Sequence, residues 1–129
     1  MELNLMLQSL TGEFTKLQSD YSKAVENRQL LDAQKSENEG VKKEFSSLTP
    51  DNNVYKLIGP ILMKQDQDEA KHNVEKRLEW IDGEIKRTES NLRSLEGKLE
   101  AKRLEVVHVQ TQIKQGETSA GPPPVVATA

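Results

Sequence analysis

Residues Val74 to Ile113, VEKRLEWIDGEIKRTESNLRSLEGKLEAKRLEVVHVQTQI, carry the most regular apolar pattern in the chain. Its apolar residues recur at alternating spacings of four and three. The positions of this pattern are Val74, Leu78, Ile81, Ile85, Thr88, Leu92, Leu95, Leu99, Lys102, Val106, Val109 and Ile113. A stripe this narrow and this long is typical of a coiled coil rather than of a helix packed on a globular core. The sequence therefore predicts one long coiled-coil helix over residues 67–114.

The N-terminal part repeats the pattern less regularly. Apolar residues follow it from Leu3 to Leu31 and again at Phe45, but Arg28, Lys35, Asn38 and Lys42 also occupy its positions. One interpretation keeps these polar residues in the seam, where they weaken a coiled coil but fix its register. The other is a stutter that moves the seam to Val41, Phe45 and Leu48. Both predict a helix over residues 1–49.

Four glycines give an independent check of the register. Gly12, Gly40, Gly83 and Gly97 all fall at the heptad position opposite the seam. Glycine inside a helix costs about 1 kcal/mol relative to alanine, so it is tolerated best where nothing packs against it. The shared position supports the predicted seam in both helices.

The segment between the helices, SSLTPDNNVYKLIGPILMKQDQDE, predicts a helix stop followed by a β-hairpin. Thr49-Pro50 ends the first helix, and two β-favouring runs flank Gly59-Pro60, which gives a hairpin over residues 53–65. Asp66 and Glu69 have the spacing of a helix cap. A compact hairpin folds the helices back on each other as an antiparallel pair, in which facing residue numbers add up to about 117. The expected fold class is mainly α: a long antiparallel two-helix coiled coil with one hairpin.

Composition excludes several classes of function. The 129 residues contain no Cys, 18 Lys+Arg and 21 Asp+Glu, for a net charge of −3. Thiolate chemistry and Cys-type zinc sites are therefore excluded, and there is no basic stripe for nucleic acid. His72 and His108 are too far apart along a helix to share a metal ion. We expect no enzyme activity, no cofactor and no metal.

The same sequence indicates a cytoplasmic protein. No apolar run is long enough to cross a membrane, and MELNLMLQSL lacks the basic start of a signal peptide. We expect neither nucleic acid nor a membrane as a partner. The last residues, QGETSAGPPPVVATA, predict a disordered tail over 115–129 after a single domain over 1–114.

Apolar residues outside the seam gather at the two ends of the predicted pair. The hairpin is apolar on both faces, and an isolated two-stranded hairpin is marginal in water, so we expect strands of several subunits to join into a closed sheet. Trp80, off the seam near the hairpin, either packs on its own hairpin or lies in a subunit contact. Leu5, Met6, Leu104 and Val107, at the other end, either hold unfolded segments or are scattered surface residues.

The segment from Asn53 to Glu96, NVYKLIGPILMKQDQDEAKHNVEKRLEWIDGEIKRTESNLRSLE, resembles the core of a β-class prefoldin subunit. The resemblance lies in VYKL, GP and KQ, followed by KRLE and EIKR, in the same order and spacing. It implies a hexamer of two α-class and four β-class subunits whose hairpins form a double β-barrel. It also implies that the coiled coils hold unfolded chains, such as actin and tubulin, without ATP and pass them to the cytosolic group II chaperonin.

The resemblance also implies roles for individual residues. The residues expected in subunit assembly, with Trp80 added from its position, are Val54, Tyr55, Leu57, Ile58, Ile61, Leu62, Met63 and Trp80. The residues expected to face clients are Leu5, Met6, Leu7, Leu104, Val107 and Val109. The alternative from another class is a coiled-coil tether or adaptor that holds no client. A parallel tether requires an unbroken seam, which Pro50 and the Gly59-Pro60 pair interrupt.

Overall fold

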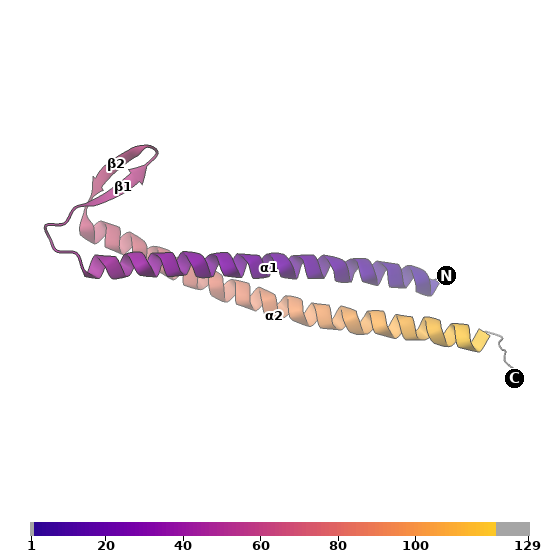
Figure 1. Ribbon diagram of the computed structural model, residues 1–129. Coiled ribbons are helices and arrows are strands. Elements are labelled where there is room, and N and C mark those ends of the chain that lie inside the picture. The colour runs from indigo at the N-terminus through magenta and orange to yellow at the C-terminus, as the bar shows by residue number, and fades with distance from the viewer. Residues whose placement is uncertain (1, 121–129) are drawn as a thin grey trace, which may run out of the picture. The chain divides into compact units, whose positions relative to one another are not determined.

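The computed structural model describes residues 2–120 and has four elements (Figure 1). Helix α1 (Glu2–Ser46) is followed by strands β1 (Val54–Ile58) and β2 (Ile61–Gln65) and by helix α2 (Gln67–Ala120). The mainly α class, with one antiparallel hairpin between two long helices, is as predicted. The chain divides into two compact units. We call Val25–Ser90, which includes the hairpin, the hairpin unit, and the described residues on either side of it (2–24 and 91–120) the terminal unit.

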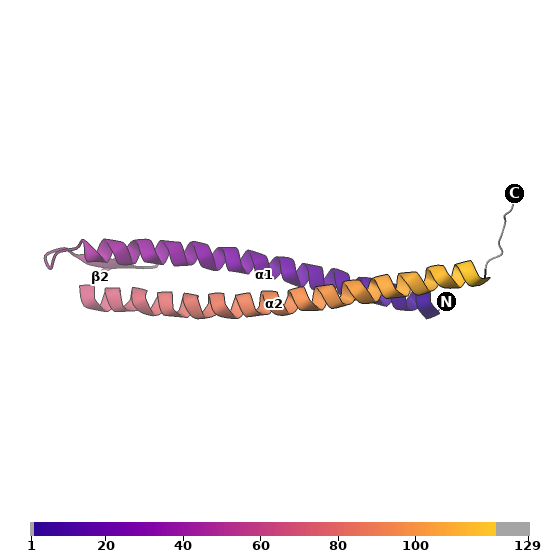
Figure 2. The ribbon, with the colours of Figure 1, turned by 90° about the horizontal axis from the view of Figure 1, so that it is seen from below.

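The helices run antiparallel within each unit, in the predicted register (Figure 2). In the hairpin unit Arg28 contacts Glu89 and Lys35 contacts Asp82, two pairs whose residue numbers add up to 117. In the terminal unit Tyr21 contacts Glu96, which has the same sum. The facing residues therefore follow the pairing that the sequence predicts.

The predicted seam of α2 forms the core. All twelve of its positions are buried or half-buried, including the polar Thr88. Leu31, Ile81 and Ile85 form a contiguous buried cluster in the hairpin unit. No large side chain among the described residues is fully enclosed. Two helices alone leave their outer faces in water, so the core of each unit is one seam wide.

The seam of α1 keeps its polar residues. Arg28, Lys35 and Asn38 are half-buried at their heptad positions, whereas Val41 is 43 % exposed. A stutter would have buried Val41, so that interpretation is wrong at this residue. Lys42 is exposed. Phe45, which both interpretations place in the seam, and Leu48, which only the stutter does, are half-buried.

The four helical glycines face water, as predicted. Gly12, Gly40, Gly83 and Gly97 are exposed, and a Cβ atom added to any of them would meet nothing within 4 Å. Their positions thus confirm the register without reference to the apolar residues.

Helix α1 ends at Ser46 rather than at residue 49. The hydroxyl of Ser47 donates a hydrogen bond to the carbonyl of Glu44 at 2.8 Å, and that of Ser46 donates to the carbonyl of Lys43. Serine hydroxyls that bond the preceding turn compete with the helical backbone pattern. Pro50 also disfavours a helical conformation at the residue before it. Together these effects stop the helix earlier than Pro50 alone would.

Helix α2 begins at the predicted cap and continues past its predicted end. The Asp66 carboxylate accepts a hydrogen bond from the Glu69 N–H at 3.2 Å. At the other end the helix reaches Ala120 instead of residue 114. Helix α2 contains no proline, and Gly116 is uncrowded, so nothing local breaks the helix before Ala120. The predicted tail therefore does not start at 115, and its remainder, 121–129, lies outside the described residues.

The hairpin closes through a two-residue turn. Ile58 pairs with Ile61, and Gly59 between them has a φ of 58°. Positive φ at the first central residue, followed by the fixed negative φ of Pro60, is the sign pattern of a type II′ turn. This turn matches the twist of antiparallel strands. Glycine is therefore needed at position 59 because other residues adopt positive φ at a cost.

Candidate assembly and binding surfaces

The hairpin exposes apolar side chains on both of its faces. Six large residues of the two strands are between 50 and 67 % exposed, while Val54 is half-buried. These six, which we call the hairpin surface, are Tyr55, Leu57, Ile58, Ile61, Leu62 and Met63. Within the described residues the sheet consists of β1 and β2 alone, so its outer edges have no partner strand. Exposed apolar strands with open edges are a template for pairing with another chain.

The hairpin rises from the ends of both helices and turns back along them (Figure 1). Between the hairpin and the helices lies a hollow of about 320 Å³. It is lined by Val41 and Phe45 of α1, Leu57 of β1, and Asn73 and Arg77 of α2, among others. The hairpin thus does not close onto its own helices, and its inner face stays accessible as well.

A glutamine fixes the base of the hairpin. The Gln67 amide Nε2, in the first turn of α2, donates hydrogen bonds to the carbonyls of Thr49 and Asn52 at 2.7 and 2.9 Å. Thr49 and Asn52 are the first and last residues of a turn, in which the Asn52 N–H donates a hydrogen bond to the Thr49 carbonyl at 3.1 Å. The connection after α1 is thereby tied to the start of α2. This role could not be predicted from the sequence, because a lone glutamine in a polar segment carries no recognisable signal.

Trp80 is mostly exposed in the hairpin unit. The residue is 60 % exposed on α2, so the first of the two predicted environments, packing on the hairpin, does not bury it in this chain on its own. The second, a subunit contact, stays a prediction. Leu30 of α1 is exposed to a similar degree, 58 %, and sequence analysis did not single it out. Leu30 directly precedes the buried seam residue Leu31 and therefore lies outside the seam. This heptad position could have predicted its exposure.

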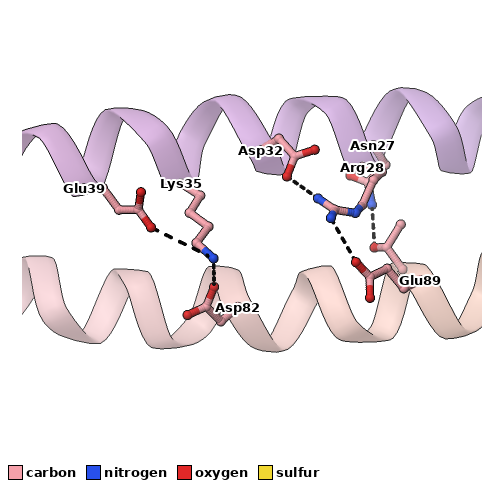
Figure 3. Close-up of polar contacts among 8 residues, drawn as sticks. Asn27, Arg28, Asp32, Lys35, Glu39, Asp82 and Glu89 are labelled. Carbon is pink, nitrogen blue, oxygen red and sulfur yellow. Dashed lines mark hydrogen bonds and ion pairs between the residues drawn. The ribbon is translucent and has the colours of Figure 1, made fainter.

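Ion pairs connect the helices of the hairpin unit (Figure 3). Arg28 Nη2 lies 2.9 Å from Glu89 Oε1, and Lys35 Nζ lies 2.9 Å from Asp82 Oδ1. Arg28 also pairs with Asp32 on its own helix. The hydrogen bond and the charge of Asp82 raise the pKa of Lys35 above its ordinary value of 10.5. These contacts are partly exposed and join the helices, which suits a role in register rather than in chemistry.

Polar contacts also join the helices of the terminal unit. The Tyr21 hydroxyl donates a hydrogen bond to Glu96 Oε1 at 3.0 Å, and this bond raises the pKa of Tyr21 above 10.0. Lys102, a polar seam residue of α2, pairs with Glu13 of α1, which raises the lysine pKa. Each polar residue named here has a partner across the helix pair.

The terminal unit exposes a second group of apolar side chains. Leu5, Met6, Leu104 and Val107 are between 45 and 64 % exposed, and we call them the terminal surface. A groove of about 330 Å³ beside them is lined by Met6, Ser9, Leu10, Glu105, His108 and Val109. The terminal surface therefore adjoins a recess with both apolar and polar walls.

Two of the six residues expected to face clients do not belong to this surface. Val109 is only 3 % exposed and Leu7 is half-buried. Both occupy seam positions, so each packs toward the facing helix instead of toward solvent. Val109 is thus covered in this structure although it lines the groove, and the client-facing role of both residues stays a prediction.

Residues 2–120 contain side chains of the metal-ligating types and two long helices. Across residues 2–120, no three His, Cys, Asp or Glu side chains come together as a metal site. His72 and His108 are both exposed. None of the described helices is long and apolar enough to span a membrane.

Comparison with known proteins identifies the family of this chain. The family model described as "Prefoldin subunit" matches residues 8–117. The chain therefore belongs to the prefoldin subunit family, which consists of chaperone subunits and is not a known family of enzymes. As a member it is a subunit of a prefoldin chaperone complex and associates with other prefoldin subunits.

Individual relatives narrow the resemblance to one kind of subunit. Human "Prefoldin subunit 6" is 42 % identical over 118 residues, which cover 91 % of this chain and 92 % of the relative. The Arabidopsis thaliana protein of that name is 40 % identical over 113 residues, 88 % of either chain. The Saccharomyces cerevisiae protein is 37 % identical over 116 residues, 90 % of this chain and 98 % of the relative.

Solved structures confirm the fold. The prefoldin beta subunit from Thermococcus strain KS-1 superposes with a TM-score of 0.71 at 20 % identity, covering 92 % of this chain and 95 % of that one. The beta2 subunit from the same strain gives 0.61 at 20 % identity, over 70 % of this chain and 97 % of that one. At this identity the likeness concerns the fold, and it agrees with the helix–hairpin–helix arrangement of the β class.

Proposed function

We propose that this chain is a subunit of a heterohexameric, ATP-independent prefoldin that acts in the cytoplasm. It captures unfolded or nascent polypeptides, actin and tubulin among them, and delivers them to the group II chaperonin. The observation that carries the proposal is the distribution of exposed apolar side chains. Ten of the thirteen large exposed apolar side chains of the described residues lie in the hairpin surface of one unit or in the terminal surface of the other, while the α2 seam is buried or half-buried.

The hairpin surface is proposed to join a β-barrel shared with other subunits. Its six exposed apolar residues and its two open edges support this role. Closing a sheet removes unpaired edges and buries apolar side chains at once. Removing such surface from water contributes about 25 cal/mol per Å², so the hairpin is stabilised by its neighbours rather than by its own helices.

The terminal surface is proposed to hold clients. Leu5, Met6, Leu104 and Val107 are too few to bind an unfolded chain tightly, but several such surfaces on one complex raise the effective concentration of contacts. Methionine adapts to irregular apolar partners. Because each contact is weak, a client is released without ATP.

Substitution of the terminal surface tests capture separately from assembly. We would reconstitute the complex with Leu5→Ser, Met6→Ser, Leu104→Ser and Val107→Ser combined in this chain, and measure suppression of actin aggregation by light scattering. The matched control carries serine at the exposed Asn4, Gln8, Gln110 and Gln112. We expect both complexes to assemble and only the first to lose suppression.

Unchanged suppression by the apolar-to-serine complex would show that this chain does not hold the client. The alternative of a structural tether predicts a different result. It requires a complex that assembles but suppresses no aggregation even with the unaltered chain.

A further inference from the structure

Three large apolar side chains are exposed on the helices of the hairpin unit, all of whose residues are described. They are Leu30 and Val41 of α1 and Trp80 of α2, with 58, 43 and 60 % of their surface exposed. They belong neither to the seam nor to the hairpin surface. We call them the Trp80 strip.

The three side chains lie on the side of the helices that faces the hairpin. Val41, Asn73 and Arg77 line the hollow beneath the hairpin. The helix faces that carry these three residues are therefore turned toward the hairpin. Trp80 follows Asn73 by seven residues and Arg77 by three, and helix residues at these spacings share a face. Leu30 precedes Val41 by eleven residues, about three helical turns, and returns to the same face.

The antiparallel register places Trp80 between the other two along the helix axis. Pairs such as Lys35–Asp82 have residue numbers that add up to 117, so Trp80 lies level with residue 37 of α1. Residue 37 falls between Leu30 and Val41. At 1.5 Å per helical residue the strip is about 16 Å long. A five-residue strand, at about 3.3 Å per residue, has nearly the same length.

We propose that the Trp80 strip is the seat for the β-hairpin of a neighbouring prefoldin subunit. This inference rests on the proposed assembly through hairpins and extends it from the sheet onto the helices. Assembly brings a neighbour's strands beside this hairpin, and the strip continues from the hollow beneath it. Its length matches one strand, and tryptophan is the residue most typical of interface hot spots.

The protein carries its own reporter for this contact, because Trp80 is its only tryptophan. We would record its fluorescence in the free chain and in a complex whose partner subunits have every tryptophan replaced by phenylalanine. The free chain should emit as an exposed indole. Assembly should shift the emission to shorter wavelength and protect it from acrylamide quenching. An unchanged spectrum on assembly would overturn the proposal.

Two other occupants give different spectra, and either would also overturn it. If the chain's own hairpin covered Trp80 in solution, the free chain would emit at short wavelength until residues 54–65 were replaced by a flexible linker. If a second copy of this chain covered it, the shift would depend on the concentration of the free chain without partners.

Substitutions measure the strength of the contact. Leu30→Ser with Trp80→Ser should weaken incorporation into the complex at least tenfold, as expected for loss of an aromatic hot spot. The control pair, Gln29→Ser with Glu79→Ser, alters exposed neighbours that point to the other side of the helices. Circular dichroism of the free chains should be alike for both pairs, since all four side chains are exposed. Incorporation of the strip variant equal to that of its control would contradict the inference.

A hairpin variant separates this inference from the proposed function. Leu57→Asp with Leu62→Asp places two charges at a cross-strand pair of the hairpin surface. If this variant fails to assemble while the strip variant assembles normally, the hairpin role stands and the strip inference is wrong. If the hairpin variant assembles as well as the unaltered chain, both are wrong.

Discussion

Lys35 of α1 and Asp82 of α2 form an ion pair of 2.9 Å across the helix pair, at a heptad position where a coiled coil ordinarily has an apolar residue. Arg28 repeats the arrangement two turns earlier with Glu89. An apolar seam tolerates sliding by one heptad, whereas a charged residue with one partner on the facing helix does not. The polar part of the α1 seam therefore fixes the register on which both the hairpin base and the Trp80 strip depend.

Reversing the charges of this pair should reveal its role. Lys35→Glu places like charges beside Asp82 and Glu39, and Asp82→Lys leaves two lysines together, so each single variant should melt at a lower temperature. The double variant should recover most of the loss. Thermal unfolding followed by circular dichroism measures this, with exposed Lys23→Glu as a control. If the double variant lost as much stability as the two single variants lost together, the pairing would be contradicted.

Tyr21 should titrate above its ordinary range. Its hydroxyl donates to Glu96, so the neutral form is favoured in the folded chain and the pKa is raised above 10.0. This stabilisation is fully present below pH 10.0 and is lost as the pH rises through the raised pKa. In a Tyr55→Phe chain, tyrosinate absorbance reports Tyr21 alone. We expect a midpoint above 10.0, lowered by Glu96→Gln; a midpoint unchanged by that substitution would refute the contact.

Alanine at the outward glycines should stabilise the chain. Gly40→Ala and Gly83→Ala meet no neighbouring atoms, so each should raise the free energy of unfolding by about 0.5–1 kcal/mol. Urea denaturation measures the gain. Gly59→Ala serves as the contrast, because the φ of 58° at that residue makes alanine strained. It should stabilise nothing and should speed amide exchange in β1 and β2. Loss of stability at Gly40 or Gly83 would show that the register is wrong.

The neighbours Ile81 and Trp80 should respond oppositely to truncation. Ile81 is 3 % exposed in the cluster with Leu31 and Ile85, so Ile81→Ala should cost about 2–4 kcal/mol of unfolding free energy. Trp80→Ala in the free chain should change it by less than about 0.5 kcal/mol because its side chain faces water. Denaturation of the two variants side by side decides this. A large loss from Trp80→Ala would mean that the indole packs within the free chain.

Much of the fold could be predicted because it depends on periodicity. The spacing of four and three in Val74–Ile113 places the seam of α2, and the cap at Asp66 marks where that helix begins. Helix ends were less predictable. Ser46 and Ser47 bond the preceding turn and end α1 early, while α2 runs on to Ala120 because nothing in its sequence stops it.

The exposed residues of these surfaces could be predicted only where their heptad position shows whether a side chain is on or off the seam. Leu5, Met6, Leu104 and Val107 are off the seam and are exposed, whereas Val109 is on it and is buried. Gln67 could not have been found, because its two hydrogen bonds reach a turn that is distant in sequence. The Trp80 strip emerges only once the hairpin is placed over one side of both helices.

We propose that this chain builds a prefoldin through its hairpin and is incomplete alone. Native mass spectrometry of the purified chain, by itself and mixed with α-class and β-class prefoldin subunits, tests it most directly. We expect no defined assembly of the chain alone and a hexamer that includes it in the mixture. A stable dimer of the chain alone, with no hexamer in the mixture, would contradict it.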